Sequence, residues 1–136
     1  MPKFGKKSIK ELSTCRKELQ EVFNEVIKTV DCSVLEGTRG QVEQDKAYKE
    51  GRSKAKYPHG RHNRLPSNAV DCVPYPVDWS DRERFTLFAG FVLGIAKSMG
   101  INLRWGGDWN QNWEVNDNKF DDFPHFEIKE EYGDKG

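Results

Sequence analysis

Residues 80–106 read SDRERFTLFAGFVLGIAKSMGINLRWG, and this stretch predicts the centre of the fold. Ser80 and Glu83 have the spacing of a capping box, in which the serine accepts a hydrogen bond from the first turn and the glutamate reaches back. Gly100 is a residue that commonly ends a helix, and residues 101–106 have the pattern of a strand. The apolar residues between them recur at helical spacing: Phe85, Phe88, Phe91, Val92, Ile95 and Met99. We therefore expect a buried central helix followed directly by a strand.

The elements on either side of that stretch are shorter or less regular. Residues 9–30 follow a second capping box, from Ser8 to Glu11, and their apolar spacing predicts one amphipathic helix. The charged segment 41–50 has weak helical character. Three apolar runs predict strands, at residues 32–36, 69–75 and 123–128. Because helices and strands do not alternate regularly, we expect an α+β domain with a small antiparallel sheet packed against two or three helices.

Length and composition restrict the class of protein. The 136 residues fit one domain over residues 1–136, with a frayed tail over residues 129–136. Hydrophobic residues make up 35% of the chain and charged residues 32%, which is too polar for a membrane protein. The net charge is zero, so nothing draws the whole protein towards nucleic acid. We expect a monomer with no nucleic-acid partner and no membrane insertion.

The zero net charge hides an asymmetry between the two halves of the chain. Residues 1–64 hold 15 basic and 9 acidic side chains, whereas residues 65–136 hold 7 basic and 13 acidic ones. The basic N-terminal half could face an anionic polymer.

Cysteine usage and the N-terminus bear on the cellular compartment. Cys15, Cys32 and Cys72 are odd in number, widely spaced and form no CxxC pair, so neither a disulfide framework nor a cysteine zinc site is indicated. Free thiols suit a reducing cytosol. No apolar segment follows the basic N-terminus, which predicts synthesis in the cytoplasm without a signal peptide.

Two histidines and one aspartate are candidates for metal binding. His62 lies in an irregular loop over residues 52–68, while Asp71 and His125 lie in predicted strands, where alternation directs them away from their apolar neighbours. An ionised aspartate in an apolar strand is costly unless it binds a cation or is well hydrogen-bonded. Two imidazoles and a carboxylate would form a zinc site with one open position. His59 is a rival to His62, and a histidine taken alone is more commonly structural.

Two further charged residues have both a chemical and a structural interpretation. Asp122 precedes His125 by three residues, so it could move protons during catalysis, or it could form a solvated turn with Asp121. Arg39 follows a predicted strand across a glycine-rich turn. It could stabilise a developing oxyanion, or it could be an exposed salt-bridging residue.

An aromatic cluster and a basic loop also have two interpretations each. Residues 104–109 and Trp113 could pack against a flat ligand such as a peptide or a sugar, or could form a small core beneath a loop. The basic residues in 52–64 could be a solvated face or could bind nucleic acid, but no nucleic-acid-binding motif accompanies them.

Four segments of the chain resemble the bacteriophage L-alanyl-D-glutamate endopeptidases, which are endolysins related to the D-alanyl-D-alanine carboxypeptidases. Residues 62–76, HNRLPSNAVDCVPYP, resemble the first zinc motif, and residues 122–127, DFPHFE, resemble the second. Residues 101–109 look like the block that follows the central helix. Residues 36–39, together with Gln44 and the Gly51-Arg52 pair, are similar to an N-terminal arginine block. The resemblance covers nearly the whole chain in the family's order.

The resemblance implies a Hedgehog/D,D-peptidase type fold and a set of site residues. It implies one Zn²⁺ held by His62, Asp71 and His125, with Asp122 as general base and acid and Arg39 as partner of the carbonyl or oxyanion. Four further residues are predicted to contact substrate: Gln44, Trp105, Asp108 and Trp109.

The activity implied is hydrolysis of the L-alanyl-D-glutamate bond in the stem peptide of peptidoglycan, which leads to lysis of the host cell. The enzyme would accumulate in the host cytoplasm and reach the wall after a holin opens the membrane. Two alternatives stay open: a D,D- or L,D-carboxypeptidase on the same scaffold, and a zinc-stabilised wall-binding module without catalysis.

Overall fold

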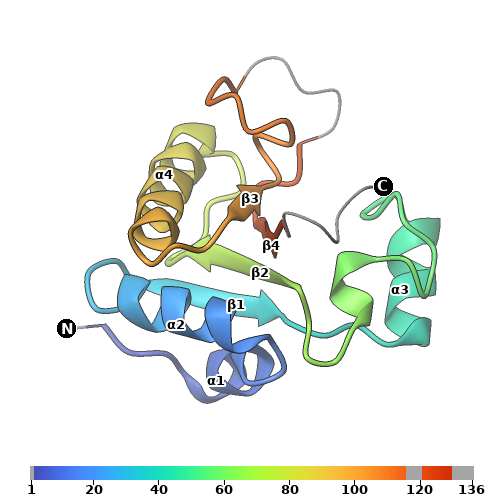
Figure 1. Cartoon of the computed structure of the whole chain (residues 1–136). Coiled ribbons are helices and arrows are strands. Elements are labelled where there is room, and N and C mark those ends of the chain that lie inside the picture. The colour runs from blue at the N-terminus through green and yellow to red at the C-terminus, as the bar shows by residue number, and fades with distance from the viewer. Residues whose placement is uncertain (1, 116–120, 130–136) are drawn as a thin grey trace.

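The computed structural model describes residues 2–115 and 121–129, and its centre is a four-stranded antiparallel sheet (Figure 1). The strand order is β1-β2-β4-β3. The bounds of the strands are Cys32–Glu36 for β1, Ala69–Pro74 for β2, Leu103–Trp105 for β3 and His125–Ile128 for β4. The predicted α+β class with a small antiparallel sheet is confirmed.

Four α-helices and one 3₁₀ turn surround the sheet in the described part of the chain. They are α1 (Lys6–Leu12), α2 (Lys17–Val26), α3 (Gln41–Lys49), η1 (Arg61–Asn63) and α4 (Arg82–Ser98). Helices α2 and α4 pack against each other, whereas α3 lies across the molecule from α4 (Figure 1). One face of the sheet is therefore covered by α2 and α4, and the other face is left to carry polar side chains.

The hydrophobic core lies between those two helices and the sheet. Phe126 of β4 is fully buried, and its ring meets Phe23 of α2 at 5.5 Å and Phe88 of α4 at 6.2 Å between ring centroids. Edge-to-face contacts of this kind add to the free energy gained by burying the rings. The core thus fixes β4, the strand that also carries His125.

The single helix predicted over residues 9–30 is wrong, because the chain breaks into α1 and α2. At the break, the backbone of residues 14–16 pairs with Ser67: Ser67 N donates to Thr14 O at 2.8 Å, and Arg16 N donates to Ser67 O at 2.9 Å. A continuous helix would use these backbone groups internally. Pairing with a distant loop overrides the helical pattern and ties that loop, which carries His62, to the N-terminal region.

Both predicted capping boxes are also wrong in detail. Helix α1 begins after Gly5, and the side chains of Ser8 and Glu11 instead accept hydrogen bonds from Val34 N at 3.0 Å and Gly37 N at 3.1 Å. At α4, Asp81 rather than Ser80 is the N-cap and accepts from Arg84 N at 3.0 Å. Ser8 and Glu11 therefore fasten β1 and the turn after it.

The remaining elements agree with the sequence apart from their lengths. The predicted strands at 101–106 and 123–128 shorten to β3 and β4, and α4 ends before Gly100, whose φ of 75° needs a residue tolerant of the left-handed region. All three cysteines are buried and free. In the part of the chain that the structure describes, no helix combines the length and apolar character that a membrane span requires. Of the predicted tail, residues 130–136 lie outside the described residues.

Candidate metal centre and the cavities beside it

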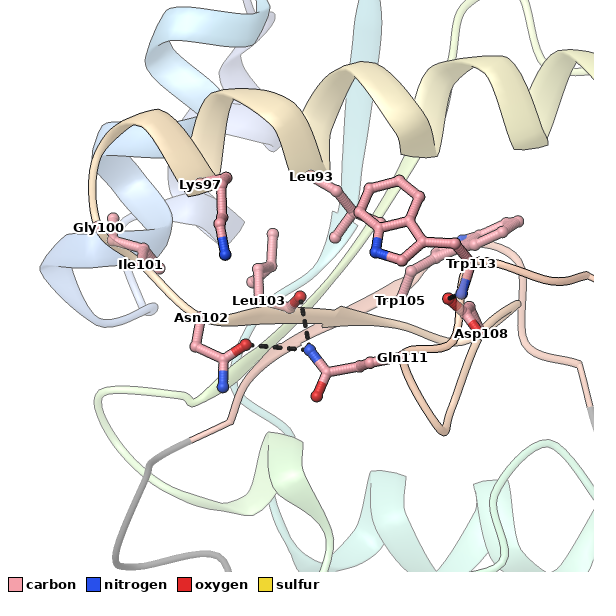
Figure 2. A pocket seen from close by; sticks show the side chains of 10 residues that line it. All are labelled: Leu93, Lys97, Gly100, Ile101, Asn102, Leu103, Trp105, Asp108, Gln111 and Trp113. Carbon is pink, nitrogen blue, oxygen red and sulfur yellow. Dashed lines mark hydrogen bonds between the residues drawn. The ribbon is translucent and has the colours of Figure 1, made fainter.

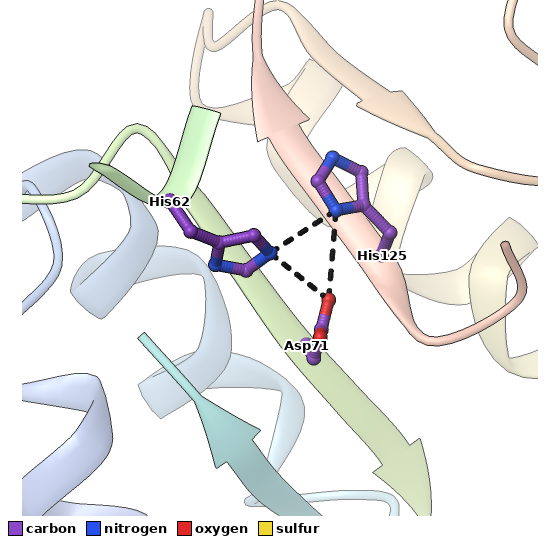
Figure 3. Close-up of side chains that lie close together, drawn as sticks. All are labelled: His62, Asp71 and His125. Carbon is purple, nitrogen blue, oxygen red and sulfur yellow. Dashed lines mark hydrogen bonds and ion pairs between the residues drawn. The ribbon is translucent and has the colours of Figure 1, made fainter. Parts of the chain in front are cut away.

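Three side chains from separate parts of the chain converge on one point (Figure 3). Asp71 of β2 and His125 of β4 are register partners, so their side chains leave the same face of the sheet. His62 reaches them from η1, with Nε2 at 3.2 Å from both Asp71 Oδ1 and His125 Nδ1. His125 Nδ1 lies 3.5 Å from Asp71 Oδ1. The predicted trio is the one such group among the described residues, and the exposed rival His59 is not part of it.

The hydrogen bonds of the two imidazoles direct their lone pairs towards this point. His62 Nδ1 donates to the carbonyl of Gly37 at 2.7 Å, and His125 Nε2 donates to Glu127 Oε1 at 2.7 Å. In the neutral imidazoles, His62 Nε2 and His125 Nδ1 are therefore acceptors. Asp71 Oδ1 is buried and accepts no hydrogen bond from any described residue. Three acceptors that face one another repel unless a proton or a cation lies between them, and this donor set suits a metal ion.

A glycine lets the backbone reach His62. A Cβ at Gly37 would collide with Glu11 O and with Thr14 Oγ1, so a larger residue would displace the turn after β1. The carbonyl of Gly37 is the acceptor that orients His62. The Gly-rich turn was noted in the sequence, but its contact with His62 depends on the tertiary fold.

Glu127 and Arg104 form an ion pair next to His125, and the sequence alone did not assign either residue to the metal site. Glu127 accepts from His125 through Oε1 and from Arg104 Nη2 through Oε2 at 2.6 Å. The ring of Trp109 packs against His125 at 5.4 Å between centroids, and Arg104 lies 5.5 Å from the same ring. Glu127 is two residues after His125 in the same strand, so strand alternation directs both to one face, and this is the signal that the sequence offers. Such partners orient the histidine and tune a bound metal.

Arg39 is buried, with 7% of its surface exposed, so the interpretation as an exposed salt-bridging residue is wrong. Its Nε and Nη2 donate to Glu36 Oε1 at 2.9 and 2.6 Å, and its Nη1 donates to the fully buried Gln44 at 2.9 Å. Nη2 also lies 3.7 Å from Asp71 Oδ2. The guanidinium is therefore held beside the metal-facing carboxylate.

Asp122 borders the same point from the turn before β4. Its Oδ2 lies 3.9 Å from His125 Nδ1. Gly106 fixes this position, because Asp122 N donates to Gly106 O at 2.9 Å and a Cβ at Gly106 would collide with Asp122 O. Burial and the nearby charge of Asp71 raise the pKa of Asp122 to about 6, although His125, His62 and Arg39 act to lower it. A carboxyl with this pKa can take and release a proton near neutral pH.

His125, Glu127 and Asp71 also have strongly shifted pKa values when no metal ion is present. Burial acts to lower the pKa of His125, but Asp71 and Glu127 raise it to about 9. Burial acts to raise the pKa of Glu127, but His125 and Arg104 lower it to about 2. The two imidazoles likewise hold the pKa of Asp71 well below its usual range despite burial. Asp71 and Glu127 are therefore ionised carboxylates that stabilise a positive charge on His125, beside the point where a cation would bind.

A cavity of 590 Å³ opens beside this group, and we call it the metal-side cavity. Its volume lies within the range of about 300–1,000 Å³ that is common for small-ligand sites. Its charged walls contain four carboxylates and two guanidinium groups, from Glu36, Asp71, Asp121, Asp122, Arg39 and Arg52. Trp79, Phe123 and Pro124 give it an apolar wall.

A second cavity, of 510 Å³, lies between α4 and β3 and is called the helix-side cavity (Figure 2). Two residues predicted to contact substrate, Trp105 and Asp108, line this cavity and not the metal-side one. Trp105 is 3% exposed and its Nε1 donates to Phe123 O at 2.7 Å, while Asp108 accepts from Trp113 N at 2.8 Å. Both side chains thus hold structure together, and their contact with substrate stays a prediction. So do the substrate contacts of Gln44, which holds Arg39, and of Trp109, which lies against His125.

Comparisons with known proteins show which proteins this chain is similar to. A family profile described as phage L-alanyl-D-glutamate peptidase matches residues 1–129. The L-alanyl-D-glutamate peptidase of Escherichia phage T5 is 32% identical over 120 residues, which cover 85% of this chain and 87% of that protein. The crystal structure of the Serratia marcescens L-Ala D-Glu endopeptidase ChiX matches with a TM-score of 0.72 and 27% identity, over 93% of this chain and 90% of that one.

Proposed function

The chain belongs to the phage L-alanyl-D-glutamate peptidase family, and from this premise we propose that it is a zinc endopeptidase that cuts the L-alanyl-D-glutamate bond of the peptidoglycan stem peptide. The observation that carries the proposal is the set of three inward-facing acceptors on His62, Asp71 and His125, of which Asp71 lines the metal-side cavity. The family's activity accounts for the bond, and the donor set accounts for the metal.

Zinc fits this donor set, since two neutral imidazoles and one carboxylate are ligands that catalytic zinc sites use. Held by His62, Asp71 and His125, it would supply Lewis-acid polarisation of the scissile carbonyl and lower the pKa of water at the site. Gly37 and Glu127 keep the two imidazoles in the tautomers that binding requires.

Asp122 is the residue that we assign to proton transfer. Its carboxylate borders the metal-facing nitrogen of His125, so a water at that point lies within its reach. Asp122 accepts a proton as the water oxygen bonds to the carbonyl carbon, and gives a proton to the alanyl–glutamyl nitrogen as the C–N bond breaks. Its raised pKa of about 6 suits both halves of this exchange.

Arg39 is assigned to the carbonyl side of the reaction. Glu36 and Gln44 hold its guanidinium rigid, with Nη2 turned towards Asp71. A fixed donor near a carbonyl that gains negative charge stabilises the transition state more than the ground state. Arg39 would therefore affect turnover more than substrate binding.

Host cell lysis is the biological role that we infer, with the enzyme reaching the wall through a membrane opened by a holin. In that setting the substrate is the intact wall polymer and the product is a wall with cut stem peptides. The basic N-terminal half of the chain would favour contact with that anionic polymer.

The test replaces Asp122 by Asn and follows the clearing of purified cell walls, with mass spectrometry of the released peptides. We expect the rate to fall by about 10²- to 10⁴-fold, with zinc content and melting temperature kept. Asp31→Asn is the matched control, because Asp31 is exposed and neither belongs to the metal-facing group nor lines the metal-side cavity. Clearing at the wild-type rate by Asp122→Asn would contradict its assignment. Release of single C-terminal amino acids would identify a carboxypeptidase instead.

A further inference from the structure

The metal-side cavity contains one guanidinium group that the mechanism leaves unused. Arg39 is committed to Glu36 and Gln44, but Arg52 forms only an ion pair through Nε with Glu50 at 2.9 Å. No described residue forms a hydrogen bond or an ion pair with the two terminal nitrogens of Arg52. Its side chain is 53% exposed and lines the cavity. The guanidinium group of Arg52 is therefore available at the wall of the cavity where substrate would bind.

The backbone of Arg52 is held in place, which separates it from an ordinary mobile surface arginine. Gly51 ends α3 with a φ of 78°, and Arg52 N and Ser53 N then donate to Ala47 O at 2.8 and 3.1 Å. The amide of Gln44 donates to Ser53 Oγ at 3.0 Å and to Ala55 O at 2.6 Å.

The same Gln44 side chain therefore connects the two arginines of the cavity. Its Oε1 accepts from Arg39, while its amide nitrogen holds the segment that follows Arg52. Because Gln44 is fully buried, this link fixes the backbone of Arg52 relative to the metal-binding group.

The chemistry of the substrate requires such a cation. A glutamyl residue has two carboxyl groups, and whichever one continues the peptide, the other remains a free carboxylate unless it is amidated. That carboxylate would enter a cavity with four carboxylates on its walls and would be repelled by them. A guanidinium group can offset this repulsion, because its planar fork matches a carboxylate with two parallel hydrogen bonds.

We propose that Arg52 is a specificity residue that binds the free carboxylate of the substrate's glutamyl residue. The inference rests on the proposed peptidase function and goes beyond it by naming how the residue after the cut bond is recognised. The Nε–Glu50 ion pair leaves both terminal nitrogens of Arg52 for the substrate, and Arg52 lines the cavity. Arg52 acts on substrate binding and leaves the bond-breaking step to the groups around His125.

The experiment compares two synthetic peptides that differ only in the glutamyl residue, one with the free carboxylate and one with the carboxamide. The zinc-loaded wild type should prefer the carboxylate peptide by about 10- to 100-fold in kcat/KM. Arg52→Gln should lose this preference through a raised KM for the carboxylate peptide, with kcat and zinc content little changed. Arg52→Lys should recover part of it.

Two control variants separate recognition from general charge. Lys49→Gln removes an exposed positive charge at the end of α3 that does not line the cavity, and it should keep the preference. Glu50→Gln removes the negative charge but keeps an oxygen that Arg52 Nε can donate to, so it should also keep the preference.

The outcomes distinguish this inference from the proposed function. If Arg52→Gln keeps the wild-type preference, or if the wild type cleaves both peptides equally well, the specificity role is wrong while the peptidase function stands. If the wild type cleaves neither peptide, the proposed function fails and this inference fails with it.

Discussion

The two cavities of this protein are similar in volume, at 590 and 510 Å³, but differ in how their polar groups are satisfied. In the helix-side cavity the polar side chains bind one another: Asp108 accepts from Trp113 N, and Gln111 donates to Asn102 (Figure 2). Beside the metal-side cavity, the acceptors of His62, Asp71 and His125 meet with no donor from another described residue between them (Figure 3). The candidate functional site is therefore marked by its unsatisfied hydrogen-bond acceptors, because the two cavity volumes are too similar to distinguish it.

Strand β4 creates this difference through the alternation of its side chains. Phe126 points to the core beneath α2 and α4, while His125 and Glu127 point to the opposite face. One strand therefore anchors the core and supplies the metal-facing histidine. Substitutions on the core side of the sheet should therefore change the free energy of unfolding. Substitutions on the polar side should change metal affinity and turnover.

Among substitutions that test the difference between the two cavities, Gly106→Ala should reduce kcat the most. The added Cβ would displace the backbone of Asp122, and a shift of about 1 Å in a catalytic group costs on the order of 100-fold in kcat. Gly106 N donates to His125 O at 2.8 Å and His125 N donates to Asp122 O at 3.1 Å, so the shift should reach this metal ligand and lower zinc affinity as well. Cleavage assays on the carboxylate peptide would measure kcat, and metal analysis of the purified variant would measure bound zinc.

Gly90→Ala is the matched control on the helix side. A Cβ at Gly90 meets nothing within 4 Å, and the residue lies exposed within α4. Helix propensity predicts a gain of about 1 kcal/mol in the free energy of unfolding, with turnover unchanged. A loss of activity in Gly90→Ala that equals the loss in Gly106→Ala would mean that the two faces are not independent.

Much of the site could be predicted from the sequence because strand alternation is local. Alternation around Asp71 and His125 placed both on the polar face of the sheet, and the structure confirms that they face each other as register partners. His62 could be singled out among the histidines only by resemblance to a family. Its approach to the other two depends on loop contacts far apart in the chain.

The features that sequence reasoning missed are tertiary in origin. The helix over residues 9–30 breaks because Ser67 pairs with its backbone, which no periodicity reveals. Glu127 was placed on the correct face, but its role in orienting His125 needs the Arg104 ion pair from another strand. Trp105 was grouped with substrate-binding aromatics because the sequence does not distinguish a buried ring from an exposed one.

A smaller effect is expected from Glu127→Gln. The amide oxygen can still accept from His125 Nε2, but the negative charge that strengthens the imidazole as a ligand is lost. Replacing such a partner costs about 10- to 100-fold in metal affinity, and the retained hydrogen bond places this variant near the lower figure. Competition with a chromophoric chelator measures the change. Unaltered affinity would show that the ion pair only supports the strand.

The pH dependence of zinc binding follows from the pKa of His125, which is raised to about 9 in the absence of metal. Zinc must displace this proton, so its apparent affinity should fall by about tenfold for each pH unit below that value.

Stability of the metal-free protein has the opposite trend. Because the pKa is raised from 6.5, the stability contributed by protonated His125 is complete below pH 6.5 and is lost as the pH rises through about 9. Chelator competition and thermal melts across this range would check both trends.

The smallest effect is expected from Trp113→Ala in the helix-side cavity. Its side chain is 70% exposed and lines only the cavity that lacks unsatisfied acceptors among the described residues. Cleavage of soluble peptides and zinc affinity should both change by less than about twofold. A large loss in either quantity would break the distinction between the two cavities.

The proposed peptidase function requires one metal ion held by His62, Asp71 and His125. Titration with Co²⁺, which gives a visible spectrum and accepts the same ligands, tests this on the wild type, on His62→Ala and on the matched control His59→Ala. We expect the wild type and His59→Ala to bind one Co²⁺ with the spectrum of a four-coordinate site, and His62→Ala to bind it at least about 100-fold more weakly. Equal affinity and an identical spectrum for His62→Ala would contradict the account.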